Sequence, residues 1–152
     1  MESSETSKDA RKLPLLPCTC ANLRRAARAI SRLYNGELQP HGVEITQLTL
    51  LMALERTGEI SQGKLGSLLA LDSTSLTRML KPLEKRGWIK VNAGEDRRIR
   101  NIRLTSAGRS KLRQSLPHWK RAQVRMQNAL GEDTMRQLAD VLAQVTAMTA
   151  EG

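Results

Sequence analysis

The 152-residue sequence is poor in the side chains that carry most enzyme and metal chemistry. It has no phenylalanine, one tyrosine, two cysteines and two histidines. So few cysteines and histidines form no cluster of the kind that holds zinc, and no metal site is expected. The GxxxxGK(S/T) loop that cradles nucleotide phosphates and the GxSxG turn that presents a nucleophilic serine are both missing. Because no nucleophile with a positioned acid and base is visible, we expect neither an enzyme nor a cofactor.

Long apolar runs are missing as well. No stretch approaches the roughly 20 apolar residues that cross a bilayer, so a membrane is not expected as a partner. The first residues are polar and mixed in charge, unlike a secretory signal or an arginine-rich transit peptide. We interpret residues 1–17 as a disordered tail and expect a cytoplasmic protein.

Positive charge is abundant. There are 25 Lys and Arg residues against 15 Asp and Glu, a formal net charge of +10. Such an excess favours a polyanionic partner, either nucleic acid or an anionic membrane surface. The length is sufficient for one domain with a hydrophobic core.

The spacing of apolar residues predicts a mainly helical chain. Apolar residues three and four apart predict helices at about 21–38, 46–56 and 74–86, with a short helix after Ser61. Between 88 and 105 the pattern alternates, which predicts a two-stranded hairpin with a charged loop. Two long helices follow, the first starting at Thr105 and the second at Gly131. This order predicts a winged helix-turn-helix with a small β-hairpin wing at 46–105, flanked by dimerisation helices at 18–45 and 106–152.

The helices at the two ends of the chain carry apolar stripes that so small a protein would struggle to cover. Pairing with a second copy would bury both stripes, so we expect a homodimer. The alternative is that the end helices pack only on their own chain.

The helix at 74–86 has an apolar side and a polar side. Small hydroxyls near its start and cations further along suit the major groove of double-stranded DNA. The candidate DNA contacts on this helix are Ser73, Thr74, Ser75, Thr77, Arg78 and Lys81. The alternative is an ordinary solvated charged face.

The charged loop of the hairpin supports the same interpretation. Three cations on a short loop, Arg97, Arg98 and Arg100, suit a narrow and strongly negative minor groove. Asp96 is the candidate wing-structuring residue, because its carboxylate can accept from loop amides or pair with an arginine. Residues 72–105 contain nine basic and four acidic side chains, so salt-dependent phosphate binding is expected.

These segments resemble a known family. Asp96-Arg97-Arg98, followed by Leu104-Thr105 and Gly108, looks like the wing signature of the MarR family of bacterial regulators. Residues 73–89, STSLTRMLKPLEKRGWI, resemble that family's recognition helix, and residues 22–54 are similar to its first two helices. The resemblance implies a dimeric repressor that binds pseudo-palindromic operators and is released by a small organic anion or by oxidation. The alternative is an architectural or adaptor protein that binds nucleic acid without switching.

The resemblance also indicates where an effector would bind. The family's pocket borders the turn after the first helix, where Tyr34 and His41 lie. Arg28 belongs to a basic band on the first helix that could hold an anion. The alternatives are an ordinary loop histidine, a half-buried tyrosine, and arginines that are solvated or paired with acids across the dimer.

Cys18 and Cys20 are candidate redox residues. They lie at the start of a predicted helix and close to arginines, both of which activate thiols. A disulfide between residues two apart would be strained, so a bridge between subunits is the expected oxidised form. The alternative is two reduced thiols packed as small apolar side chains.

Overall fold

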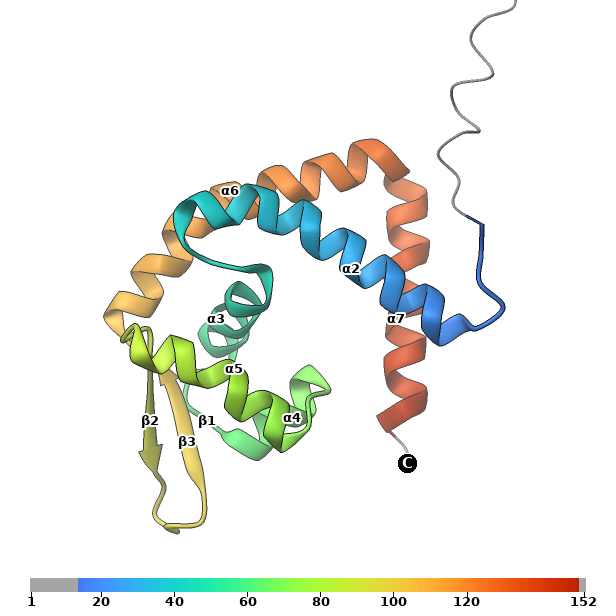
Figure 1. Cartoon of the computed structure of the whole chain (residues 1–152). Coiled ribbons are helices and arrows are strands. Elements are labelled where there is room, and N and C mark those ends of the chain that lie inside the picture. Colours follow the sequence, from blue (N-terminus) through green and yellow to red (C-terminus); the bar gives the residue numbers. More distant parts are fainter. Residues whose placement is uncertain (1–13, 151–152) are drawn as a thin grey trace, which may run out of the picture. The chain divides into compact units, whose positions relative to one another are not determined.

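The computed structural model describes residues 14–150, without the side chains of 149 and 150. The elements in chain order are α2 (Thr19–Leu38), η1 (Gln39–His41), α3 (Ile45–Thr57), β1 (Ile60–Ser61), α4 (Gln62–Leu69), α5 (Ser73–Lys85), β2 (Ile89–Ala93), β3 (Arg100–Leu104), α6 (Ser106–Leu130) and α7 (Glu132–Ala150). Figure 1 shows the strands gathered beside α3 and α5. The mainly helical class with a small β wing is confirmed. Of the predicted tail at 1–17, residues 1–13 lie outside the described residues.

Residues 14–32 and residues 33–150 form two compact units, and each is described by itself. In the first unit, the segment before α2 is tied to the start of that helix. The side chain of Asn22 accepts from the Leu16 amide and donates to the Leu16 carbonyl, at 3.0 and 2.8 Å. Arg25 donates to the Pro14 carbonyl at 2.8 Å.

Three helices of the second unit, α4, α5 and α6, begin at side chains that cap them. Ser61 accepts from the Lys64 amide at the start of α4, and Thr105 accepts from the Gly108 amide at the start of α6. Asp72 caps α5 by accepting from the Ser75 amide at 2.7 Å. An oxygen at this position satisfies a backbone donor that the helix itself leaves unpaired.

The sheet has three antiparallel strands in the order β1-β3-β2. The prediction of a two-stranded hairpin was incomplete, because β1 pairs along the free edge of β3 with Ile60 opposite Ile102. A strand of two residues is too short to show an alternating pattern, so its sequence gives no signal. On the other edge, Ile89 of β2 lies opposite Leu104 of β3.

The core of the winged module lies between α3, α5 and the sheet. Its buried apolar side chains are mostly leucines, and they include Leu48, Leu51, Leu54, Leu76, Leu83 and Ile102. The start of α6 meets the start of β2 closely, because a Cβ added at Gly108 would lie 2.0 Å from the Trp88 carbonyl oxygen. Only glycine permits this approach, which fixes α6 against the wing.

The last helix has no buried side chain in the described part of the chain. Its exposed apolar residues are Val141, Leu142 and Met148, with 51%, 44% and 73% of their surface accessible. Within residues 14–150, no helix combines the length and the apolar character that crossing a membrane requires.

Candidate nucleic-acid interface

The helix α5 presents a cationic face to solvent. Leu76, Leu80 and Leu83 are buried against the core, whereas Arg78 and Lys81 are exposed on the opposite side. The division of the two faces therefore agrees with the helical spacing of the sequence. Exposed cations on a helix of this kind are available for phosphates and for the edges of bases in a major groove.

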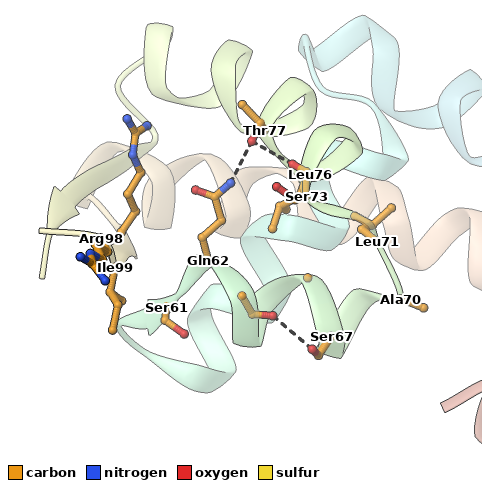
Figure 2. Close-up of a pocket in the computed structure, with 13 residues that line it drawn as sticks. Ser61, Gln62, Ser67, Ala70, Leu71, Ser73, Leu76, Thr77, Arg98 and Ile99 are labelled. Carbon is orange, nitrogen blue, oxygen red and sulfur yellow. Dashed lines mark hydrogen bonds between the residues drawn. The ribbon is translucent and has the colours of Figure 1, made fainter. Parts of the chain in front are cut away.

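Two of the hydroxyls predicted to meet DNA are occupied within the protein. Ser75 Oγ donates to Asp72 Oδ2 at 2.9 Å. Thr77 Oγ1 donates to the Ser73 carbonyl at 2.9 Å and accepts from Gln62 Nε2 at 2.9 Å, as Figure 2 shows. The hydroxyls of Ser73 and Thr74 have no such partner among the described residues. These two side chains are therefore the hydroxyls of α5 that remain available to a ligand.

The cap of α5 is electrostatically favourable. The Asp72 carboxylate accepts hydrogen bonds from the Ser75 amide and from the Ser75 hydroxyl. Both bonds hold the pKa of Asp72 below its ordinary value, and the bond from the amide has the larger effect. A negative charge at this end of the helix also complements the helix dipole. Asp72 thus stabilises the start of α5 in the conformation that exposes Ser73 and Thr74.

The loop at the tip of the wing is closed by its own backbone. The Gly94 amide donates to the Ile99 carbonyl at 2.7 Å, and the Ile99 amide donates to the Asp96 carbonyl at 2.9 Å. Asp96 Oδ1 accepts from the Arg98 amide at 3.0 Å. Of the two roles expected for Asp96, the structure shows the bond to a loop amide. The side chains of Arg97, Arg98 and Arg100 are all exposed.

A concave surface of about 930 Å³, which we call the wing hollow, lies between the start of α4, the start of α5 and the wing. Figure 2 shows Gln62 projecting into it, between Thr77 and Arg98. Arg98 and Arg100 contribute positive charge, and none of the described residues that line the hollow is acidic. Gln62 was not among the predicted site residues. Its place immediately after the capping Ser61, in the first helix of the helix-turn-helix, was the available signal.

The candidate effector residues occupy different places. Tyr34 is buried and donates to Gln123 Oε1 of α6, and burial raises the pKa of Tyr34. His41 stacks on His118 of α6 with ring centroids 3.3 Å apart. Arg28 is exposed on the part of α2 that belongs to the separately described unit. The structure thus brings Tyr34 and His41 to α6.

A second concave surface, of about 510 Å³, lies along α6 and is called the α6 hollow here. It is lined by Glu37, Pro117, Lys120, Arg121, Val124 and Arg125. Glu37 forms ion pairs with Arg121 and Arg125, each at 3.2 Å. The hydrogen bond from Arg121 is the largest influence that lowers the pKa of Glu37. Two guanidinium groups and one ammonium group therefore border an apolar strip with one carboxylate between them.

Two cations, Arg86 at the C-terminal end of α5 and Lys111 of α6, hydrogen-bond to the turn that follows α2. Arg86 Nη1 donates to the Gly42 carbonyl at 2.5 Å, and Lys111 Nζ donates to the adjacent carbonyl of His41. Both cations also lie over the ring of Trp88, at 4.8 and 5.6 Å from its centroid. We call this arrangement the Trp88 joint. It connects the winged module to the turn where His41 lies.

The two cysteines are exposed and unpaired. Cys18 precedes α2, and its carbonyl accepts from the backbone and side-chain amides of Asn22, both at 3.1 Å. The expectation that the thiols pack as small apolar groups is not met, because both side chains are accessible to solvent.

Comparison with known proteins gives a consistent result. Residues 43–99 match the family model described as MarR family. The chain is 35% identical over 105 residues to the uncharacterized HTH-type transcriptional regulator YdgJ of Bacillus subtilis, covering 68% of this chain and 64% of that protein. It is 32% identical over 89 residues to YwoH, a second uncharacterized HTH-type regulator of that organism, covering 59% and 65%. The chain thus spans less than two thirds of the length of these curated relatives.

A solved structure extends the similarity to the whole fold. The crystal structure of the M. tuberculosis transcriptional regulator MosR in complex with DNA has a TM-score of 0.75 and 29% sequence identity. The match covers 86% of this chain and 98% of that chain. It therefore includes the long helices outside the winged module.

Proposed function

The winged helix-turn-helix of this chain belongs to the MarR family of transcriptional regulators, and from this premise we propose that the protein is a cytoplasmic, homodimeric regulator of transcription that binds double-stranded DNA at specific sequences. The family and the relatives are transcriptional regulators and not enzymes. The observation that carries the proposal is the wing hollow. An exposed cationic helix and an arginine-bearing wing border the same acid-free concave surface.

Each element has a groove that suits it. The helix α5 enters a major groove, where Arg78 and Lys81 reach phosphates or base edges and Ser73 and Thr74 approach closely. The wing enters the adjacent minor groove, where Arg97, Arg98 and Arg100 meet the strongest negative potential. Asp72–Ser75 and Asp96–Arg98 are internal hydrogen bonds that keep the two elements in shape. The roles of Ser75 and Thr77 in this arrangement are structural.

A homodimer explains the exposed apolar residues of the last helix. A second copy would remove Val141, Leu142 and Met148 from water, which a single chain leaves uncovered. Because a dimer with two-fold symmetry presents two identical winged modules, its operator is pseudo-palindromic, with half-sites about one helical turn apart.

We also propose that the regulator is a repressor and that binding of a small organic anion releases it from DNA. Three cations border the α6 hollow, which is partly apolar, so its chemistry suits a lipophilic acid. Tyr34, His41 and Arg28 remain the residues proposed to take part in effector binding. Oxidation of Cys18 and Cys20 is the alternative signal, and both thiols are exposed to an oxidant.

The experiment that tests DNA binding is selection of duplexes from a random-sequence pool, followed by titration of the selected duplex and a scrambled one. The proposal expects a pseudo-palindromic consensus and tighter binding to the selected duplex. Binding that shows no sequence preference would instead indicate an architectural protein. A series of aromatic and lipophilic acids, and an oxidant, then tests release, with a Cys18→Ser/Cys20→Ser variant as the control for the thiols.

A further inference from the structure

The wing hollow offers hydrogen-bond donors without competing negative charge. Its described lining combines the hydroxyl of Ser61, which accepts from the Lys64 amide and keeps its own hydrogen, the amide of Gln62 and the guanidinium groups of Arg98 and Arg100. An acid-free surface with donors and two cations suits an anion whose oxygen atoms accept hydrogen bonds. Among the ligands of the proposed function, the phosphodiester backbone has this chemistry.

The geometry of duplex DNA places a backbone strand in this hollow. Adjacent major and minor grooves are separated by one sugar–phosphate strand. If α5 occupies a major groove and the wing occupies the neighbouring minor groove, the strand between the grooves passes between α5 and the wing. The hollow lies between these two elements (Figure 2). Its floor must therefore meet phosphates, whereas the bases face the elements on either side.

The hydrogen bonds of two side chains in the hollow, Thr77 and Gln62, determine which of them can donate to a ligand. A threonine hydroxyl has one hydrogen to donate, and Thr77 uses it on the Ser73 carbonyl. Thr77 can therefore only accept from Gln62, so the amide group of Gln62 must face Thr77 with its nitrogen. That nitrogen carries a second N–H, which has no acceptor among the described residues.

From this arrangement we propose that the wing hollow is a phosphodiester site, in which Gln62 donates its second amide N–H to a phosphate oxygen and Thr77 is the positioning residue for Gln62. This inference rests on the proposed function, and it assigns Thr77 a role in place of the predicted direct contact with DNA. Since the Gln62 amide is neutral, it adds a hydrogen bond without releasing a counterion. Arg98 and Arg100 supply the charge.

The test uses the full chain and the duplex that it selects from random-sequence DNA. Gln62→Ala should weaken binding roughly 10-fold, the scale of a lost hydrogen bond to a charged group, and equally on selected and scrambled duplexes. The dependence of affinity on salt should stay that of the parent. Thr77→Val should reproduce the loss, Thr77→Ser should restore parental affinity, and the double variant should be no weaker than Gln62→Ala. Gln114→Ala, which changes an exposed glutamine of α6 outside the hollow, is the matched control.

A scan with methylphosphonate, which replaces one charged phosphate at a time by a neutral group, locates the contact. The parent should lose affinity at several phosphates, and Gln62→Ala should become indifferent to one of them in each half-site. An unchanged scan for Gln62→Ala, or a loss of preference at one base pair instead, would overturn the inference. A parent that selects no duplex would overturn the proposed function itself, which is a separate outcome. Unfolding midpoints of the variants that match the parent's exclude a loss of affinity through misfolding.

Discussion

The imidazole rings of His41 and His118 stack at 3.3 Å between their centroids, one from the turn after α2 and the other from α6. Desolvation is the main influence that lowers the pKa of His118, and electrostatic interactions with His41 and then with Arg121 lower it further. The charge of Glu37 acts in the opposite direction. Lys111 adds a further cation beside the carbonyl of His41. His118 therefore resists gaining a proton in the folded protein. The stack is therefore a contact between two elements that is favoured while His118 is neutral.

This stack predicts a pH dependence of stability. Because the pKa of His118 in the folded protein lies below its ordinary value of 6.5, the unfolded chain takes up the proton more readily. The stability that the stack contributes is complete above about pH 6.5 and is lost as the pH falls below it. Urea midpoints measured between about pH 7.5 and 5.5 should decrease, and they should decrease less for His118→Gln. Glu37 does not account for this decrease, because its pKa is lowered from the ordinary value of 4.5 and so lies below the pH range of the measurement. An identical pH dependence in parent and variant would contradict the prediction.

The Trp88 joint predicts a coupling between the turn after α2 and the exit of α5. Arg86→Gln removes a cation from the Trp88 ring and a donor from the Gly42 carbonyl. We expect a loss of about 1 kcal/mol in the free energy of unfolding, the scale of one exposed cation–π contact and one hydrogen bond. In a Trp119→Phe background Trp88 is the remaining tryptophan, so its emission reports the joint directly. Emission that Arg86→Gln leaves unchanged would show that the contact does not form in solution.

Gly108 predicts a steric limit at the start of α6. A Cβ there would lie 2.0 Å from a backbone oxygen of Trp88, which cannot move without shifting β2. Gly108→Ala should therefore lower the free energy of unfolding by about 1–3 kcal/mol. Gly36→Ala is the matched control, because a Cβ at this helical position meets nothing within 4 Å and alanine favours helices. Equal stability of the two variants would mean that α6 and the wing are not in close contact.

The last helix predicts the oligomeric state. Leu142→Glu places a charge among the exposed apolar residues Val141 and Met148. If a second copy covers them, the variant should sediment as a monomer and bind the operator far more weakly than the parent, since a monomer engages one half-site. Ala143→Glu adds the same charge at an exposed position on the other side of the helix and serves as the control. A parent that is itself monomeric at high concentration would rule out the dimer.

Features that depend on neighbouring residues were predictable from the sequence. The caps at Ser61 and Thr105 and the two faces of α5 follow from local hydrogen bonding and helical spacing, and the structure has them in place. Features that join distant segments were not predictable. Ile60 pairs with Ile102 through a strand of two residues. Gln62 meets Thr77 across the helix-turn-helix, where the sequence pattern gave only an exposed hydroxyl.

The His41–His118 stack illustrates the same limit. A histidine in a turn and a histidine in a long helix carry no mutual signal, because their separation along the chain is far greater than any helical or strand period. The candidate site was thus predictable as two separate surfaces, α5 and the wing. The hollow that joins them required the positions of α4 and β3 in space.

The central claim is that α5 and the wing contact DNA together, and substitution of each element separates their contributions. Arg78→Ala on α5 should cost roughly 1–3 kcal/mol of binding free energy and, if Arg78 touches a base, relax specificity at one position in each half-site. Measured on base-substituted duplexes, an unchanged preference at every position would restrict Arg78 to phosphates.

The measurement that tests the claim most directly is the salt dependence of DNA affinity for Arg98→Ala, on the selected duplex and on a scrambled one. Arg98 is exposed on the wing and borders the hollow. Its loss should weaken binding to both duplexes and make the slope of log affinity against log salt shallower by about one per half-site. Arg113→Ala, an exposed arginine of α6, should leave the slope unchanged. If Arg98→Ala left both affinity and slope at the parental values, the wing would not be a DNA contact and the account would be contradicted.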